Sequence, residues 1–216
     1  RVATAAGDPV PGVLLSATSG GGSTTSDANG DYTLHEAYGW SGSVLATKAG
    51  YTFQPGSRSY ANVQAAVTGQ NYQANQATFT ISGRVATSGG AGVSGVTLEG
   101  LPGNPITDAN GYYSVTVNYG FETVIAPTRT GYTFTPATLA VAAVTANTPN
   151  QNFTAALRTF TISGKVTLSG GAAVSGVTVT GLPGSPMTDA GGNYSATVTY
   201  GFAGTATPSK AGHVFT

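Results

Sequence analysis

Apolar and polar residues alternate along several short stretches of the chain. The clearest cases are residues 79–85, 113–117 and 160–166, where Phe, Tyr, Ile and Val alternate with Thr and Ser. Successive side chains of a strand point to opposite faces, so this period of two predicts β-strands with one buried and one solvated face. Shorter apolar runs predict further strands at 96–98, 177–179, 141–144 and 151–155. No stretch shows helical periodicity with capping residues, so an all-β fold is predicted.

The strand pattern repeats with a constant period of 81 residues. Asp-Ala-Asn-Gly at 27–30 recurs at 108–111 and, as Asp-Ala-Gly-Gly, at 189–192. A tyrosine and a glycine keep the same spacing at Tyr32, Tyr113 and Tyr194 and at Gly50, Gly131 and Gly212. A fixed period is the signature of an array, and about 80 residues suffice for a small domain.

We therefore predict three tandem domains, at residues 1–75, 76–157 and 158–216. Gly, Pro and Asn clusters separate the strands at intervals typical of sandwiches, so each domain is expected to be an Ig-like β-sandwich of about seven strands. The first domain lacks a counterpart of 78–83, and the third lacks the counterpart of 136–155. Both ends are therefore expected to be cut from a longer array. The linkers, 74–77 and 156–158, are short and not Gly/Ser-rich, which predicts a rod.

Three strings in the second repeat carry a family resemblance: FTISGRV at 79–85, GVSGVTL at 92–98 and TDANGYYSVTV at 107–117. They resemble the carboxypeptidase regulatory-like family, within the prealbumin-like and Cna-B-like sandwiches. The resemblance covers essentially the whole chain. It implies a noncatalytic extracellular domain of a secreted enzyme, adhesin or surface protein of bacteria or archaea. The Lys–Asn isopeptide bond of many Cna-B-like domains does not carry over, because Arg1 and Arg84 occupy the lysine position in two repeats.

Composition narrows the classes of function. Charged residues make up 7% of the chain and the net charge is zero, which argues against binding to nucleic acid. No apolar run is long enough to span a membrane. The chain has no cysteine, which excludes disulfides and thiolate metal sites. A surface rich in Thr, Ser, Asn and Gly suits an extracellular setting, and no cofactor is implied.

The repeated Asp-Ala-Asn-Gly motif has two interpretations. Asp27, Asn29 and Asp31 sit at alternate positions, as calcium ligands do, but an EF-hand-type loop needs glycine at its sixth position and Glu at its twelfth. The preferred interpretation is a structural turn, of type I′, with Asn-Gly supplying positive φ. The turn residues are Asp27, Asn29 and Gly30, then Asp108, Asn110 and Gly111, then Asp189, Gly191 and Gly192.

Two aromatic residues flank a glycine in every repeat. The pairs are Tyr38 and Trp40, Tyr119 and Phe121, and Tyr200 and Phe202. Repetition favours packing at the end of the sandwich, and the alternative is a platform on which sugar rings stack. Another repeated motif is Gly-Tyr-Thr-Phe at 50–53, and its aromatic residues are expected to face the core.

No catalytic residue is predicted. His35 falls on an outward strand position, and no serine or acid keeps register with it across the repeats, so it lacks the partner that a general base needs. The repeated bases, which include Lys48, Arg129 and Lys210, are given no major role, because exposed ion pairs contribute only about 0–1 kcal/mol.

The sequence therefore favours a noncatalytic structural repeat of a prokaryotic stalk, surface protein or filament. It would act as a stiff spacer and associate with copies of itself or with neighbouring domains through open strand edges. The alternative is a carbohydrate-binding accessory module of a secreted polysaccharide-degrading enzyme. Adhesion to a partner protein is a third hypothesis, for which the sequence offers no patch.

Overall fold

The computed structural model describes all residues, Arg1–Thr216, and contains eighteen strands and no helix. The all-β prediction is therefore confirmed. Because the chain forms no helix, no helix long and apolar enough to cross a membrane is present.

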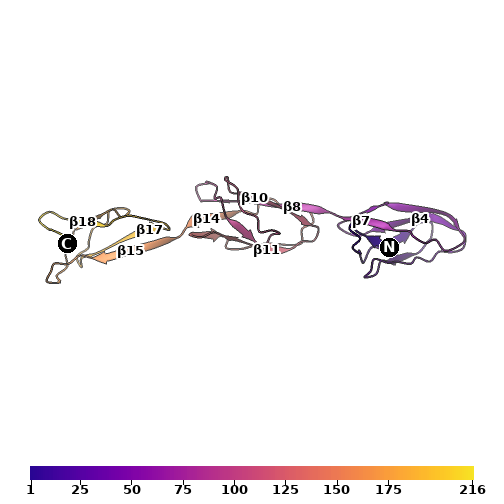
Figure 1. Cartoon of the computed structure of the whole chain (residues 1–216), viewed down its shortest axis with the longest axis horizontal. Coiled ribbons are helices and arrows are strands. Elements are labelled where there is room, and N and C mark those ends of the chain that lie inside the picture. The colour runs from indigo at the N-terminus through magenta and orange to yellow at the C-terminus, as the bar shows by residue number, and fades with distance from the viewer. The chain divides into compact units, whose positions relative to one another are not determined.

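The first repeat forms two sheets. One has the strand order β3-β2-β4-β6 and the other β1-β7-β5, with β1 parallel to β7. Figure 1 labels β4 of the first sheet and β7 of the second. The strands are β1 (Val2–Ala3), β2 (Leu14–Ala17), β3 (Ser23–Thr25), β4 (Trp40–Thr47), β5 (Tyr51–Gln54), β6 (Ser57–Val63) and β7 (Tyr72–Gln76). Residues 31–37, where the later repeats have a strand, form none here.

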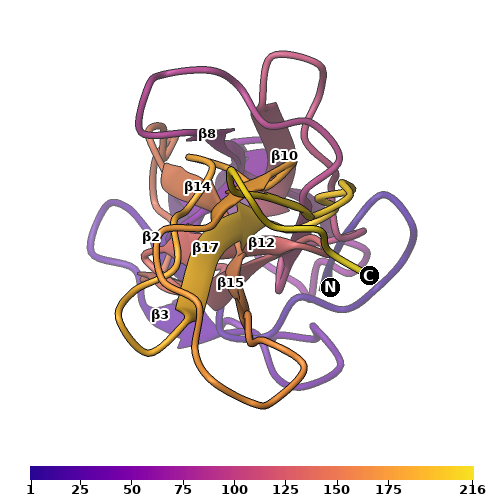
Figure 2. The same ribbon diagram turned by 90° about the vertical axis from the view of Figure 1, so that its left-hand side faces the viewer.

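The later repeats supply the remaining strands. The second repeat contributes sheets of order β10-β8-β14-β12 and β13-β11-β9, and the third contributes the pairs β15-β17 and β16-β18. β15 and β17 lie side by side over seven residue pairs (Figure 2). The strands are β8 (Thr78–Ala86), β9 (Thr97–Glu99), β10 (Tyr112–Asn118), β11 (Thr123–Thr128), β12 (Tyr132–Thr135), β13 (Leu139–Val141), β14 (Phe153–Leu157), β15 (Thr159–Lys165), β16 (Thr178–Thr180), β17 (Asn193–Thr199) and β18 (Thr207–Ser209).

The chain forms two compact units. The first consists of Arg1–Ser82, Ser114–Thr123 and Ala140–Pro149, and the second of Gly83–Tyr113, Val124–Leu139 and Asn150–Thr216. The first unit contains the junction between the first and second repeats, and the second unit contains the junction between the second and third. Each junction therefore lies within one unit.

Two local predictions need correction. The predicted linkers 74–77 and 156–158 are largely strand, because β7 continues to Gln76 and β14 to Leu157. Only Ala77 and Arg158 separate these strands from β8 and β15. The strand predicted at 141–144 is β13, which runs over Leu139–Val141, and Val144 instead exchanges backbone hydrogen bonds with Gly120 and Phe121.

Small aliphatic side chains fill the cores. Val2, Val13 and Leu15 are fully buried in the first repeat, and Val179 and Leu182 are buried in the third. The alternation in β7, where Tyr72 and Ala74 are buried and Gln73 between them is exposed, follows the period of two from which the strands were predicted. Burying one such side chain contributes about 1.5–3 kcal/mol.

Buried tyrosines tie strands to neighbouring backbone. The Tyr72 hydroxyl donates to the Val44 carbonyl at 2.8 Å, and the Tyr113 hydroxyl donates to the Gln151 carbonyl at 2.5 Å. Tyr32 makes the bond equivalent to that of Tyr113, to the carbonyl of Gln70. Burial raises the pKa of both Tyr72 and Tyr113 to about 12, because the charged phenolate is poorly solvated there.

Replacing Tyr113 by Phe is expected to change the alkaline stability of the protein. Unfolded tyrosine ionises near pH 10, whereas folded Tyr113 keeps its proton to about 12, so its contribution to stability is present below pH 10 and is lost as pH rises towards 12. Tyr113→Phe should lower the free energy of unfolding at neutral pH by about 1 kcal/mol through the lost hydrogen bond, and should flatten its decline above pH 10. Urea denaturation at a series of pH values measures both effects.

Tyr112→Phe is the matched control, because the adjacent Tyr112 side chain is 54% exposed. The control should retain the wild-type slope. Equal slopes for the two variants would contradict the assignment of the alkaline loss to Tyr113.

Candidate functional site

The Asp-Ala-Asn-Gly motif forms the same hydrogen-bonded turn in each repeat. One carboxylate oxygen of Asp27 accepts the amide protons of Asn29 at 2.9 Å and of Asp31 at 2.8 Å. Asp108 and Asp189 accept the corresponding pairs of amides. In the third repeat these bonds, led by that from Asn193, hold the pKa of Asp189 below its usual range. The carboxylate thus serves the backbone of its own turn.

The turn is not of the predicted type I′. Among its residues Gly30 has positive φ and Asn29 does not, and the Gly30 amide donates to the Asp27 carbonyl at 2.9 Å. This pattern is that of a type I turn with Asp first and Gly fourth. A Cβ on Gly30 would lie 2.2 Å from the Val2 carbonyl oxygen, so the glycine also permits the turn to dock on the first strand.

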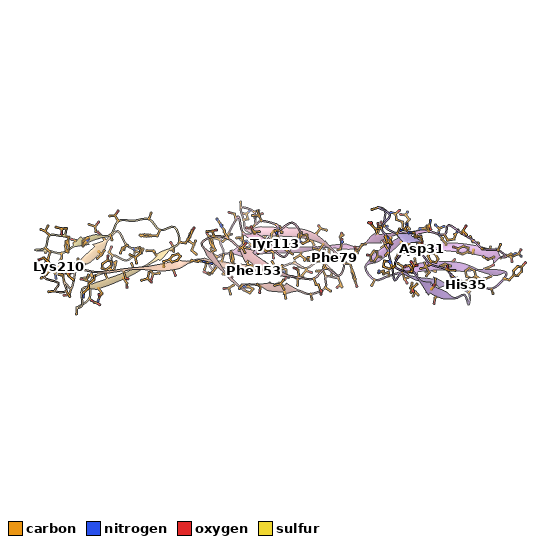
Figure 3. The ribbon with its side chains drawn as sticks, turned by 60° about the horizontal axis from the view of Figure 1, so that its bottom comes forward. Asp31, His35, Phe79, Tyr113, Phe153 and Lys210 are labelled. Carbon is orange, nitrogen blue, oxygen red and sulfur yellow. The ribbon has the colours of Figure 1, made fainter.

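The weak calcium candidates do not assemble into an acidic cluster. No group of three or more His, Asp or Glu side chains is placed to hold a metal ion. Asp27 is engaged by backbone amides, as described above, and the carbonyl of Asn29 accepts a bond from the Arg1 guanidinium at 3.1 Å. Asp31 is exposed (Figure 3).

A backbone clamp joins the first repeat to the second. The amide of Ala77 donates to the Gly50 carbonyl at 2.7 Å, and the Ala77 carbonyl accepts the amide proton of Tyr119 at 2.9 Å. The Tyr119 ring covers Gly50 so closely that an added Cβ would lie 2.3 Å from ring carbons. Phe79 packs beside Tyr119, with the ring centroids 6.5 Å apart. Both polar groups of the joint residue are therefore satisfied by neighbouring segments.

The second joint reproduces this arrangement. Arg158 donates its amide to the Gly131 carbonyl at 2.9 Å and accepts the Tyr200 amide at 2.8 Å. The Tyr200 ring would lie 2.3 Å from a Cβ on Gly131. Gly212, the third glycine of this series, has nothing within 4 Å of an added Cβ. We call the two sets, Gly50 with Ala77 and Tyr119, and Gly131 with Arg158 and Tyr200, the joint clamps.

The aromatic pairs therefore occupy different surroundings. Tyr119 and Tyr200 belong to the joint clamps, whereas Tyr38, in the same position of the first repeat, is 80% exposed. Trp40 packs on Tyr60 with ring centroids 6.0 Å apart, and its buried indole N–H has no hydrogen-bond partner. Phe121 is half-buried, and Phe202 packs against the core of the third repeat.

The repeated bases bind backbone carbonyls, which the sequence did not predict. Lys48 donates to the Pro11 carbonyl at 2.5 Å, Arg129 to the Ser94 carbonyl, and Lys210 to the Ser175 carbonyl at 2.5 Å. Lys48 and Arg129 also lie over the rings of Tyr51 and Tyr132. The only signal in the sequence was their fixed spacing.

A groove of about 710 Å³ lies in the first repeat. One wall is the segment 32–38 together with Trp40, the other is the segment 63–71, and Arg1 lies at the end. His35 is exposed on one wall, and Glu36 accepts the Gly22 amide at 3.0 Å. Figure 3 shows His35 apart from Asp31, and no acid or nucleophile is paired with it. The groove thus offers aromatic and backbone contacts and no acid–base pair.

Comparison with known proteins supports the fold class more strongly than it supports any function. No family model matches the chain. Chitinase ChiA of Flavobacterium johnsoniae is 33% identical over 165 residues, which cover 73% of this chain and 10% of the chitinase. The chain thus spans about a tenth of the length of this curated relative.

Among solved structures, the Bacillus anthracis TIE protein is similar with a TM-score of 0.64 and 14% identity, over all of this chain and 45% of that one. This likeness confirms the fold class. The minor pilin GBS52 of Streptococcus agalactiae also matches, with a TM-score of 0.32 and 14% identity over 74% of this chain and 87% of the pilin.

Replacing Gly131 by Ala is expected to destabilise the second joint. The change forces a side chain to adopt φ of +82° and drives its Cβ into the Tyr200 ring. We expect a loss of about 2–4 kcal/mol in the free energy of unfolding, from backbone strain plus overpacking. Chemical denaturation with hydrogen exchange at the Arg158 and Tyr200 amides measures it.

Gly212→Ala is the control, since it introduces the same strain, at φ of +76°, into open space. It should cost about 1–2 kcal/mol. Equal losses for the two variants would show that the tyrosine contact contributes nothing.

Proposed function

We propose that this chain is a noncatalytic structural segment of an extracellular or cell-surface protein of a prokaryote, in which tandem β-sandwiches act as a stiff spacer. The observation that carries the proposal is the pair of joint clamps. A flexible tether needs residues that are free to rotate, whereas Ala77 and Arg158 each have both backbone polar groups bonded. The proposed domains are 1–75, 76–157 and 158–216.

The chemistry of the chain agrees with this role. Charged residues make up 7% of the sequence, and the bases that repeat are directed to backbone carbonyls. No group of three or more His, Asp or Glu side chains is placed to hold a metal ion. A similar segment occurs within a chitinase, a protein about ten times as long as the part matched, as expected of a module that accompanies other domains.

Loss of both clamps should loosen the proposed spacer. In the double variant Gly50→Ala/Gly131→Ala, the tyrosine rings must leave the joints, so the domains should reorient independently. Small-angle X-ray scattering should then show a smaller maximum dimension and a broader distance distribution than for wild type, while the circular dichroism of the strands is retained. Gly212→Ala is the control and should scatter like wild type.

An unchanged scattering profile in the double variant would refute the proposal that the clamps stiffen the chain. Association with other copies through unpaired strand edges is the further part of this proposal. A strictly monomeric mass by light scattering at high concentration would remove that part and leave the spacer.

A second candidate function is binding to polysaccharide. Its support is the similarity to a segment of a chitinase, together with the aromatic residues Tyr38, Trp40 and Tyr60 along the groove. Aromatic faces are suited to stacking on sugar rings, and Tyr38 is largely exposed. In this function the chain would be an accessory module of a secreted enzyme.

Affinity electrophoresis through gels containing chitin derivatives or other polysaccharides tests this second function. Wild type should be retarded, and Tyr38→Ala, which alters an exposed side chain, should lose most of the retardation. Tyr112→Phe, which changes an exposed tyrosine away from the groove, is the control. Equal mobility of wild type and Tyr38→Ala on every gel would remove the candidate.

A further inference from the structure

Two strands lie at the edges of their sheets without the features that usually keep an edge from pairing. β10 is the first strand of the sheet β10-β8-β14-β12, and β17 has one neighbour, β15. Each has seven residues, none of them charged and none of them proline. The other edge strands have two to four residues or, in β6 and β15, contain a basic residue, Arg58 or Lys165. Because short length and charge protect sheet edges, β10 and β17 are the edges open to a further strand.

Backbone hydrogen bonds at both ends of β17 fix which of its groups face β15. The Tyr200 amide donates to the Arg158 carbonyl at 2.8 Å, and the Val166 amide donates to the Gly192 carbonyl at 2.8 Å. Both bonds fit the register in which β15 and β17 pair. Bonded pairs alternate along an antiparallel ladder, so every second residue counted back from Tyr200 faces β15. The residues between them direct their amides and carbonyls to the open side.

Ser195 and Thr197 are the residues of β17 whose backbone is free on this side. Their amides and carbonyls make no hydrogen bond within the protein, and both side chains are exposed. Asn193 lies on the same side, but its amide donates to the Asp189 carboxylate at 2.8 Å and its carbonyl accepts the Asp189 amide at 2.9 Å. The Thr199 carbonyl accepts an amide of the following turn at 3.0 Å. The two turns therefore limit the open edge to 195–197.

β10 has the same open edge in the second repeat. The Tyr119 amide donates to the Ala77 carbonyl at 2.9 Å, which is the counterpart of the bond from Tyr200. By the same alternation, the backbone groups of Ser114 and Thr116 point away from β8, and both side chains are exposed. We call 114–116 and 195–197 the open edges. They are Ser-Val-Thr and Ser-Ala-Thr, with the 81-residue spacing of the repeats.

Each open edge is complementary to a second copy of itself. When two β17 strands run antiparallel about a two-fold axis at Ala196, Ser195 of one copy lies opposite Thr197 of the other. These two residues exchange both of their hydrogen bonds, and symmetry repeats the exchange, so that all four free groups of each copy are paired. On the inner side, Tyr194 lies opposite Val198, and an aromatic residue beside a β-branched one is a favourable cross-strand pair.

We propose that the open edges join copies of this chain, each edge pairing antiparallel with the same edge of a second copy. A copy suits this position because it presents the same free residues in the same order, so symmetry supplies a partner for every group. Nothing repels it, since the open edges are uncharged and the net charge of the chain is zero. The inference rests on the association part of the proposed function, for which it names the strands and the partner, and it does not involve the joint clamps.

Proline substitutions in the whole chain test the pairing, because they remove one amide from each open edge. The amides of Thr116 and Thr197 are not used within the protein, so Thr116→Pro and Thr197→Pro should fold. Sedimentation equilibrium from micromolar to millimolar concentration measures association. The mass of wild type should rise with concentration, and each single variant should form nothing larger than a dimer, since one edge remains. The double variant should associate about tenfold more weakly than wild type.

The double variant Thr116→Val/Thr197→Val is the matched control. It changes the same side chains but keeps both amides, so it should associate like wild type. Hydrogen exchange adds a readout within wild type. The amides of Ser195 and Thr197 should exchange more slowly as concentration rises, whereas the Ala196 amide, which faces β15, should exchange at a constant rate.

Charge pairing tests the same edge without proline. With Thr116→Pro in the background, one chain carries Ser195→Lys/Thr197→Lys and a second carries Ser195→Glu/Thr197→Glu. Each chain alone should remain monomeric, because like charges lie opposite each other across the two-fold axis. An equimolar mixture should form heterodimers.

The proposal is overturned if wild type stays monomeric over the whole concentration range, or if the proline and valine double variants associate equally. It is also overturned if either single proline variant is entirely monomeric, because β10 would then pair with β17, or if the oppositely charged chains fail to associate. Scattering from dilute, monomeric protein still tests the joint clamps after any of these results, so failure of this pairing and failure of the spacer role are distinguishable.

Discussion

The backbone of the first strand of a repeat is the element on which the rest of the fold depends. In the second repeat, residues from Ala77 to Val85 bond in turn to Tyr119, Thr148 and Gly111. The same strand thus fixes the joint, a distant loop and the Asp-containing turn. A buried backbone amide or carbonyl needs a hydrogen-bond partner, and few other partners are within reach of these groups. The position of this one strand therefore sets the positions of segments that are far apart in the sequence. The groove of the first repeat lies where the early part of this strand runs in the second.

Glycines and basic residues at particular positions support this network of backbone hydrogen bonds. Gly30 is required because a Cβ would strike the Val2 carbonyl, and Gly50 because one would strike the Tyr119 ring. Lys48 and Lys210 donate to the backbone carbonyls of Pro11 and Ser175, which lie in other loops. The few basic residues that repeat therefore hold loops together through hydrogen bonds to backbone carbonyls.

The sequence predicted those features that arise from local periodicity. Strands such as β8 and β15 followed from the alternation of Phe and Ile with Thr and Ser, and the repeats followed from the 81-residue spacing. The joints could not be predicted as clamps, because Ala77 has no distinctive side chain and acts through its backbone. The type I′ turn was wrong because Asn-Gly was interpreted without the strand against which the turn docks. The carbonyl partners of the repeated bases lie in other loops, which periodicity does not identify.

The three equivalent tyrosines, Tyr38, Tyr119 and Tyr200, share one sequence motif but have different surroundings. Two of them cover a glycine of the preceding repeat, and the third, in the same sequence motif, is 80% exposed. The motif therefore has one structural use in two repeats and an unpaired aromatic face in the remaining one. An aromatic side chain that is needed for packing at every joint requires no ligand to explain its presence in all repeats. Recognition by this chain is to be sought where the repeats differ, and the exposed side chain of Tyr38 is one such difference.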